Sequence, residues 1–449
     1  MKPRAKEKGT LGVRKFLFSL ALFSWLSGLG FAAQPLAKPF NVLWITGESL
    51  QARHLHCYGY HKETSPHIDA LAKRGVLFHL CVSPSGWTSE SMISNLLGVY
   101  SPVHGVITRD RAVAAEWRTP MEMLREAGYI LPRMTDYQAK AAHRHLGYTE
   151  DEANHLPPWD WIARHKDEPF FMWYHLYESH LPYDAPEPHH SLFWSDDLLT
   201  TRDSTWRVQL VREKNVLPRS SITFNPDEDA EAVRALYDAE VHFIDAKFGR
   251  IMKALDECGL RERTLVIFSA DHAEGLLEHG VIGHASTLRG GNLYDETILV
   301  PLILSFPGVL PENVAIKSQV RGVDVMPTIF ELLQWPQLEY FQGETLMPLI
   351  QDPARGLDRI AFSASSYKGY LEDDPQNVQN LLRVVRTPEW KLDYRMLGGE
   401  EEYFLYHLKD DPGETRDVKR RNPRTFRKMK KRLSDWLDQC KATEIRREQ

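Results

Sequence analysis

The residues best suited to chemistry in this sequence form a short cluster of acids and imidazoles. Asp271 and His272 stand side by side, Glu274 follows, and His279 and His284 complete the segment. An adjacent carboxylate and imidazole offer a hard oxygen and a nitrogen to one cation. For that pair alone, an Asp that caps a helix beside a surface His is an equal alternative. Three imidazoles so close together favour a metal or phosphate site.

Further polar groups follow two other apolar runs. Glu48 comes after Asn41–Thr46, and His180 comes after Pro169–His175. Ligands of open α/β sheets gather beyond the carboxyl ends of the strands. Glu48 is therefore expected to join Asp271 if their strands are neighbours, and His180 to supply another imidazole. His175 lies inside its apolar run and is predicted to be a core residue with satisfied hydrogen bonds.

A group of hydroxyls precedes a helical pattern. Thr88, Ser89 and Ser91 stand before the apolar positions Ile93 and Leu96. A hydroxyl at a helix start lies in positive potential, which suits an attacking alkoxide and an anionic substrate. The same residue types also serve as ordinary helix caps. The local sequence leaves both readings open.

The elements that must position these residues are short strands alternating with helices. Asn41–Thr46, Pro169–His175 and Thr264–Ala270 are apolar runs typical of buried strands. Apolar residues recur at helical spacing from Val233 to Leu255. This alternation predicts an α/β fold, a sheet with helices on both faces. Residues 184–226 are rich in Pro, Ser and Asp and are predicted to form a long insertion or substrate loop.

The C-terminal part has a different sequence pattern. Short alternating segments at Leu382–Arg386, Trp390–Tyr394 and Tyr403–His407 precede a basic helical stretch from Pro423 to Gln439. We expect a small antiparallel sheet closed by a terminal helix. The predicted organisation is a catalytic domain over residues 34–345 and a C-terminal subdomain over residues 346–449.

Composition and charge restrict the function. The 449 residues are 43% hydrophobic and 26% charged, which excludes a disordered chain, a collagen-like repeat and a multi-span membrane protein. The net charge is −6 although residues 1–33 hold six Lys or Arg against one Glu, so the rest of the chain is more acidic still. An acidic body argues against nucleic acid as a partner. Four cysteines are too few for a disulfide scaffold, and the sequence does not pair them.

The N-terminal segment predicts export. Six basic residues precede an uncharged apolar run from Phe16 to Ala33 that ends in small residues, the layout of a secretory signal. An uncleaved membrane anchor is the alternative, because eighteen apolar residues are near the lower limit of a spanning helix. We expect a periplasmic or extracellular protein in either case.

In order along the chain, these pieces resemble the sulfatase branch of the alkaline phosphatase superfamily. The resemblance runs from about Asn41 to Leu437. Its landmarks include Cys57-Tyr58-Gly59-Tyr60, Ser65-Pro66-His67-Ile68-Asp69, Leu97-Gly98-Val99-Tyr100, His104-Gly105-Val106, Ser269-Ala270-Asp271-His272, Val300-Pro301-Leu302-Ile303 and Asp410-Asp411-Pro412-Gly413-Glu414-Thr415. The resemblance implies an alkaline phosphatase-like fold with a large, mostly parallel sheet.

The departures from that family concern the nucleophile. Sulfatases oxidise a Cys or Ser followed by x-Pro-x-Arg to formylglycine, whereas this chain has Thr88-Ser89-Glu90-Ser91-Met92. Glu48-Ser49 replaces the usual paired Asp. Both changes are similar to the phosphoglycerol and phosphoethanolamine transferases of the superfamily. By that likeness the metal ligands are Glu48, Thr88, Asp271 and His272.

The same likeness assigns the remaining roles. Thr88 is the nucleophile, and His180 and His284 hold the substrate's anionic group or a second metal. The cofactor is one divalent ion, with Mn, Zn, Mg and Ca all open, and a second ion is an alternative. The resemblance implies an exported hydrolase or transferase that acts on phosphate or sulfate esters through a covalent Thr88 intermediate.

Two rival functions stay open. One is a sulfuric ester hydrolase without formylglycine, and the other is an inactive protein that binds an anionic glycan. The expected partner is an anionic ester: an envelope glycan, a lipid head group or a small phosphoester. The basic stretch 419–432 suits either contact with anionic lipid or a solvated helix face.

Overall fold

A computed structural model describes residues 39–108, 111–134, 141–149, 156–195, 226–284, 291–367 and 380–445. Residues 34–449 form one compact unit. The predicted export segment 1–33 and most of the predicted loop 184–226 lie outside the described residues. Of that loop, residues 184–195 are described and include one short helix, α6.

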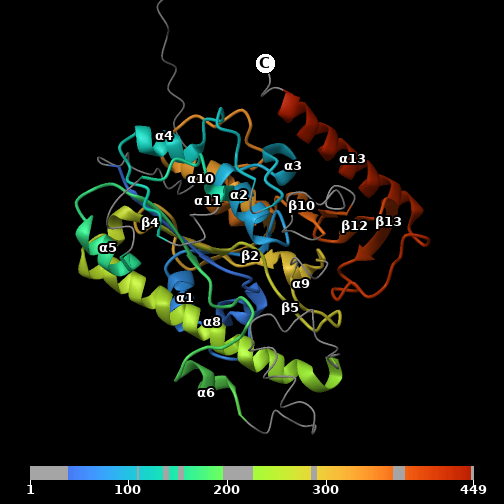
Figure 1. The fold of residues 1–449 in the computed structure, drawn as a ribbon, viewed down its shortest axis with the longest axis horizontal. Helices are drawn as coiled ribbons and strands as arrows, with labels where there is room; N and C mark the ends of the chain where they lie inside the picture. Colours follow the sequence, from blue (N-terminus) through green and yellow to red (C-terminus); the bar gives the residue numbers. More distant parts are fainter. Residues whose placement is uncertain are drawn as a thin grey trace, which may run out of the picture. The chain divides into compact units, whose positions relative to one another are not determined.

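The large sheet carries seven strands in the order β3-β1-β4-β8-β2-β7, with β9 beside β2 (Figure 1). Their bounds are β1 Asn41–Gly47, β2 Val76–Val82, β3 Phe171–Leu176, β4 Thr264–Ala270, β7 Leu299–Val300, β8 Leu302–Ser305 and β9 Val314–Arg321. The sheet is mixed, but its longest ladders, β1 with β3, β1 with β4 and β2 with β9, are parallel. Glu48, His180 and Asp271 follow β1, β3 and β4, and these three strands are neighbours in the sheet.

Helices cover both faces of this sheet (Figure 1). In Figure 1, α1 and α8 lie on one side, and α2 and α10 lie on the other. The helices are α1 Pro66–Lys73, α2 Thr88–Leu97, α3 Ser101–His104, α4 Pro120–Glu126, α5 Pro158–Arg164, α6 His189–Phe193, α8 Pro226–Glu257, α9 Asp295–Ile298, α10 Val325–Leu332, α11 Met347–Gln351 and α13 Pro423–Ile445. Short 3₁₀ turns occur at Ala52–His54, His56–Tyr58, Ala141–His143, Arg261–Arg263, Gly322–Asp324 and Pro353–Arg355. The predicted α/β class is confirmed.

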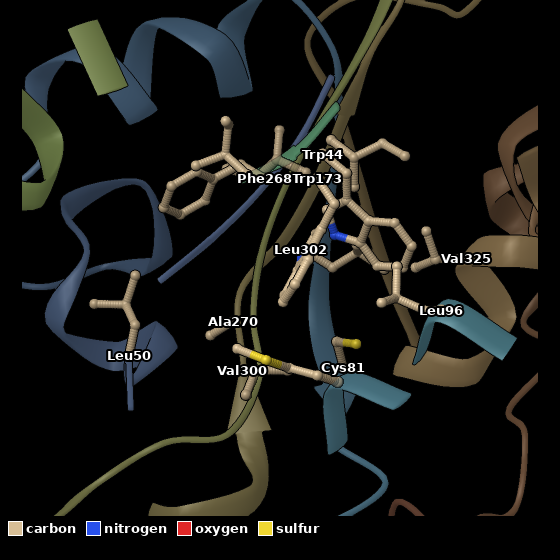
Figure 2. Close-up of a cluster of buried hydrophobic side chains, with 14 of the residues drawn as sticks. Trp44, Leu50, Cys81, Leu96, Trp173, Phe268, Ala270, Val300, Leu302 and Val325 are labelled. Carbon is tan, nitrogen blue, oxygen red and sulfur yellow. The ribbon is translucent and has the colours of Figure 1, made fainter. Parts of the chain in front are cut away.

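The core lies between these layers because the central strands are apolar on both faces, as buried parallel strands must be. Trp44 of β1 pairs in register with Trp173 of β3. Figure 2 shows both side chains on the side of the strands where Leu96 of α2 and Val325 of α10 lie. Phe268 of β4 packs on Phe248 of α8, with ring centroids 5.2 Å apart. This packing holds the ends of β1, β3 and β4 rigidly in place.

A second, smaller sheet has the antiparallel order β10-β11-β12-β13 and is followed by α13. Its strands are β10 Ala361–Ser366, β11 Leu381–Arg386, β12 Trp390–Leu397 and β13 Glu400–His407. The predicted small sheet and terminal helix are confirmed, with β10 as an additional strand. The predicted boundary at residue 345 stays a prediction.

Two further observations concern the cysteines and the membrane. Cys57, Cys81, Cys258 and Cys440 are all free thiols. Among the described residues, no helix combines the length and the apolar character needed to span a membrane.

Candidate active site

The candidate site lies at the carboxyl ends of the central strands. Gly47, the last residue of β1, pairs with Ala270 of β4 and with Leu176 of β3. Glu48 and Asp271 are the next residues of their chains, so the parallel register places both carboxylates at one edge of the sheet. Glu48, Asp271 and His272 are completely buried.

Thr88 reaches the same point from the other side. It is the first residue of α2, after Trp87 in extended conformation. Its Oγ1 lies 3.0 Å from Glu48 Oε1 and 3.2 Å from His272 Nε2. His272 Nε2 is also 3.3 Å from both Glu48 Oε1 and Asp271 Oδ2. The four residues predicted as metal ligands therefore converge, although Thr88 lies 40 positions from Glu48 and 184 from His272 along the chain.

The two imidazoles predicted to hold the substrate lie beside this group. The His284 ring centroid is 4.3 Å from that of His272 and 5.1 Å from that of His180. His284 Nδ1 lies 2.9 Å from Glu274 Oε1 and 3.3 Å from Ser49 Oγ. His180 Nδ1 donates to the Leu181 carbonyl. Both rings are thus oriented through Nδ1.

Burial and mutual charge dominate the ionisation of the site. Burial tends to raise the pKa of Glu48, but hydrogen bonds from His175 and His272 hold it well below its usual range. Burial and the neighbouring Glu48 charge raise the pKa of Asp271 to about 7. For His272, burial favours the neutral ring, yet the charges of Asp271 and Glu48 raise its pKa to about 9. The ionisation of Asp271 and His272 therefore depends on the carboxylate of Glu48.

This donor set fits a divalent cation. Asp271 Oδ2 is buried and accepts no hydrogen bond. His272 donates through Nδ1 to the Ala273 carbonyl at 2.9 Å, the arrangement that ligating histidines adopt, and its Nε2 faces Thr88 and the two carboxylates. Ligand atoms of Glu48, His272 and His284 lie within 4.8 Å of one another. A carboxylate and imidazole set of this kind suits Zn²⁺ or Mn²⁺, and oxygen-rich variants suit Mg²⁺ or Ca²⁺.

His175 is nearer to the site than the sequence indicates. It is buried with satisfied hydrogen bonds, as predicted, but its partners are functional. Its Nε2 donates to Glu48 Oε2 at 2.7 Å, and its Nδ1 accepts from Thr46 Oγ1 at 2.9 Å. His175 therefore orients the Glu48 carboxylate. Its apolar neighbours in β3 masked this role.

The sequence analysis gave no role to two other residues of the site. Ser49 donates its backbone N–H to Asp271 Oδ1 at 3.0 Å and its hydroxyl to Glu48 Oε1 at 3.1 Å. Glu274 is completely buried and orients His284. Ser49 lies one position and Glu274 two positions after a predicted ligand, and that closeness was the available signal. His279, in contrast, pairs with Glu296 at 2.7 Å and stacks on Tyr294, away from this group.

The start of α2 is fixed by hydrogen bonds to both sheets. Ser83 and Ser91 both donate to the Asp271 carbonyl at the end of β4. Glu90 is completely buried, and its carboxylate accepts from Ser101 Oγ and from the Ser366 backbone N–H, each at 2.8 Å. Ser366 ends β10, so the small sheet supports the helix that carries Thr88.

Strand β10 also holds the turn before α2. Ser363 Oγ donates to the Ser83 carbonyl at 2.6 Å, and the Ala364 N–H donates to the Pro84 carbonyl at 2.8 Å. The small sheet is thus part of the site's framework.

Comparison with known proteins establishes the family. The sulfatase family model matches residues 40–131 and 131–335, and the model of the N-sulphoglucosamine sulphohydrolase C-terminal region matches residues 283–443. The chain belongs to the sulfatase family. The resemblance inferred from the sequence is confirmed. Residues 88–92 still differ from the formylglycine motif described above, since the segment Thr88-Ser89-Glu90-Ser91-Met92 contains no Cys, Pro or Arg.

The relatives of this sulfatase-family chain are named as ester hydrolases. It is 25% identical over 399 residues to an ulvan-active sulfatase from Formosa agariphila, covering 81% of this chain and 62% of that protein. Phosphonate monoester hydrolase of Agrobacterium radiobacter has the same fold, with a TM-score of 0.67, 19% identity, and 90% and 96% of the two chains covered. Another structure, solved with its substrate D-glucosamine-2-N,6-O-disulfate, gives a TM-score of 0.64 at 18% identity, with 91% and 98% covered.

Proposed function

We propose that this sulfatase-family protein is a metal-dependent hydrolase of anionic esters in which the Thr88 hydroxyl is the nucleophile. The observation that carries the proposal is the position of Thr88 Oγ1, within 3.2 Å of both Glu48 and His272. A hydroxyl used only as a helix cap would bind the backbone N–H groups of its own first turn, and α2 has no side-chain cap.

The residues of the site have different roles in the proposed reaction. Glu48, Thr88, Asp271 and His272 would hold the divalent ion, which supplies Lewis-acid stabilisation of the anionic ester. Thr88 Oγ1 passes its proton to Glu48 Oε1 and bonds to the central atom of the ester, while the bond from that atom to the alcohol oxygen breaks and the alcohol leaves with a proton from solvent. His180 and His284 stabilise the non-bridging oxygens. Water then attacks the central atom and releases its proton to solvent, the bond to Thr88 Oγ1 breaks, and the proton held by Glu48 returns to Thr88.

We propose phosphate esters as the favoured substrates. Attack by an ordinary hydroxyl on a phosphate gives phospho-Thr88, which a second attack at phosphorus can release. Attack by the same hydroxyl on a sulfate ester would give a sulfo-Thr88 that is hard to release. Formylglycine sulfatases avoid such an intermediate because their nucleophile is an aldehyde hydrate. This chain has no Cys or Ser at position 88 from which formylglycine could be made. Hydrolysis is favoured over transfer because the named relatives are hydrolases.

The test combines three variants. Thr88→Ala should lower kcat by about three or more orders of magnitude while retaining metal, because Glu48, Asp271 and His272 remain. Thr88→Ser should keep measurable turnover, and Ser89→Ala should lose far less. Wild-type protein quenched during turnover of p-nitrophenyl phosphate should carry phosphate on the peptide that contains Thr88. Full activity of Thr88→Ala would refute the mechanism.

Sulfate ester hydrolysis is the second candidate function. It is favoured by the names of relatives, among them the ulvan-active sulfatase, and by a structural neighbour solved with a disulfated glucosamine. Comparing kcat/KM for p-nitrophenyl phosphate, bis-p-nitrophenyl phosphate and p-nitrophenyl sulfate separates the two. Higher kcat/KM for the sulfate would replace the phosphate assignment.

We also propose that the protein acts outside the cytoplasm. The basic residues and apolar run of residues 1–33 support this proposal. The mature protein should begin near Ala33 or Gln34 and be recovered from the cell envelope or medium. Cytosolic protein whose intact mass includes Met1 would contradict export.

A further inference from the structure

Positive charge is concentrated in residues 416–432, at the end of the small sheet and the start of α13. Ten of these seventeen residues are Lys or Arg and one is an acid, Asp417, although the whole chain has a net charge of −6. The proposed reaction uses none of them. Cations this dense on an acidic protein indicate an anionic partner if they gather on one exposed surface.

Helix α13 gathers them in this way. Its buried side chains recur at steps of three and four residues: Met429, Leu433, Trp436 and Cys440. Trp436 stacks on Phe362 of β10, with ring centroids 4.7 Å apart and planes 6° from parallel, which fixes the helix about its axis. The opposite side of the helix carries four exposed cations, also at steps of three and four, which we call the basic face: Arg424, Arg427, Lys428 and Lys431. In Figure 1, α13 lies on the outside of the molecule beside the small sheet.

The charge of the basic face is largely unneutralised. Lys431 pairs with Asp435, one turn further along the helix. In the part of the chain that the structure describes, no carboxylate lies within 4.0 Å of the side chains of Arg424, Arg427 or Lys428. These three cations therefore present their full charge to whatever lies outside the protein.

This placement is unfavourable for a helix that faces only water. Arg424 stands in the first turn of α13, where the helix dipole is positive, and no acid occurs in that turn. Arg424 is followed by Arg427 and Lys428 three and four positions later, and such like-charged pairs destabilise a helix. Anionic groups outside the protein would remove both unfavourable effects.

The neighbouring surface favours a flat anionic partner over a flexible polyanionic chain. A cavity beside α13 is lined by Lys428 and Arg432, but equally by Asp358 and Glu389, so its charges balance. A polyanionic chain that entered this cavity would meet both carboxylates. A flat surface that touches the basic face does not enter it.

Aromatic rings on the same helix and the adjoining strand point to the same partner. The Lys430 ammonium lies 3.9 Å from the ring centroid of Tyr403 on β13 and 5.7 Å from that of Phe426 on α13. Both rings are half-buried. Cations beside Tyr and other aromatic side chains are typical of protein surfaces that lie at the level of lipid head groups.

We propose that the basic face docks this protein on a bilayer that contains anionic lipid, with the lipid phosphates as partners of Arg424, Arg427 and Lys428. The contact is peripheral, because the apolar side of α13 stays packed against the protein. Each Lys or Arg at such a surface strengthens binding about fivefold. The proposal is independent of the catalytic mechanism and assigns a partner to a surface that the reaction does not use.

Vesicle sedimentation tests the proposal. It uses residues 34–449, which form one compact unit and lack the basic and apolar segment 1–33 that would itself bind lipid. We expect vesicles of phosphatidylcholine with about one third phosphatidylglycerol to bind the protein at least about 100-fold more tightly than phosphatidylcholine alone. Salt at about 1 M, where the Debye length is about 3 Å, should abolish this preference. The triple variant Arg424→Gln, Arg427→Gln, Lys428→Gln should lose about 100-fold in affinity for the anionic vesicles.

The matched control is the triple variant Lys73→Gln, Arg164→Gln, Lys166→Gln, which removes the same charge from exposed side chains at the ends of α1 and α5. It should bind the anionic vesicles as the parent protein does. Urea unfolding checks that both variants are folded.

No preference of the parent protein for anionic vesicles, or an equal loss in the two triple variants, would overturn the proposal. Binding that persists at high salt would also overturn it, because apolar insertion would then replace charge. Sedimentation with a dextran sulfate matrix but not with vesicles would assign the basic face to a polyanionic chain instead.

Discussion

At the scale of single residues, the site depends on groups that orient its ligands. Glu48 receives a proton donor on each oxygen, His175 on Oε2 and Thr88 and Ser49 on Oε1. Ligating carboxylates are commonly held in this way, and losing such a partner weakens metal binding about 10- to 100-fold. The positions of the proposed ligands Glu48, Asp271 and His272 were predictable because they follow strands, whereas Thr88 stands at a predicted helix start. His175 was not predictable as an orienting group, since its partner lies 127 positions away and its own neighbours are apolar.

His175→Ala should therefore lower metal affinity about 10- to 100-fold while leaving the fold intact. The Glu48 carboxylate would lose the donor that fixes Oε2. Competition with a fluorescent chelator measures the affinity. His143→Ala is the control, because His143 is an equally buried imidazole that stacks on Trp173 of the same strand and belongs to no candidate ligand group. Equal metal affinities for the two variants would show that His175 has no orienting role.

At the scale of elements, the first turn of α2 matters most, because it carries Thr88 and is held in place by β10. Apolar runs predicted β1, β3 and β4, and helical spacing predicted α8. Strand β10 was missed because its sequence, Ala-Phe-Ser-Ala-Ser-Ser, is small and polar. It is held in the structure by hydrogen bonds to distant residues. Ser366 bonds to Glu90, which lies 276 positions earlier, and Ser363 bonds to Ser83 in the turn before α2, which lies 280 positions earlier. Local patterns do not reveal such distant pairings.

Glu90 gives the element-scale prediction. Glu90→Ala should destabilise the protein by about 2–3 kcal/mol, because the buried Ser366 N–H and Ser101 hydroxyl both lose an acceptor. It should also lower kcat, since Thr88 belongs to the same turn. Glu90→Gln keeps an amide oxygen for the Ser366 N–H and should stay within about 1 kcal/mol of wild type. Urea unfolding and kcat check both effects, and equal stability of the two variants would contradict the account.

At the scale of the whole molecule, charge couples metal binding to pH. Ionised carboxylates and a neutral imidazole are required for ligation, so each raised pKa makes protons compete with the metal. Burial and neighbouring charge raise the pKa of Asp271 to about 7, and the acids around buried His272 raise its pKa to about 9. Glu48 has a lowered pKa and stays ionised throughout this range.

Metal affinity should consequently fall as the pH falls. Between about pH 9 and 7 one proton must leave His272, so affinity should drop about tenfold per pH unit. Below about pH 7 Asp271 also binds a proton, and the drop should approach about 100-fold per unit. Calorimetric titration in two buffers of different ionisation enthalpy counts the released protons. An affinity that does not change between pH 6 and pH 8 would contradict this coupling.

The bonds from β10 to the turn before α2 also set an order of events during synthesis. Ser83 leaves the ribosome 280 residues before Ser363, its hydrogen-bond donor, and pairings of such sequence separation form late in folding. The turn before α2 thus waits for β10, whereas β1 and the α2 segment have long been available. A nascent or truncated chain that stops before β10 should be catalytically inactive, so ester cleavage requires that β10 has been synthesised.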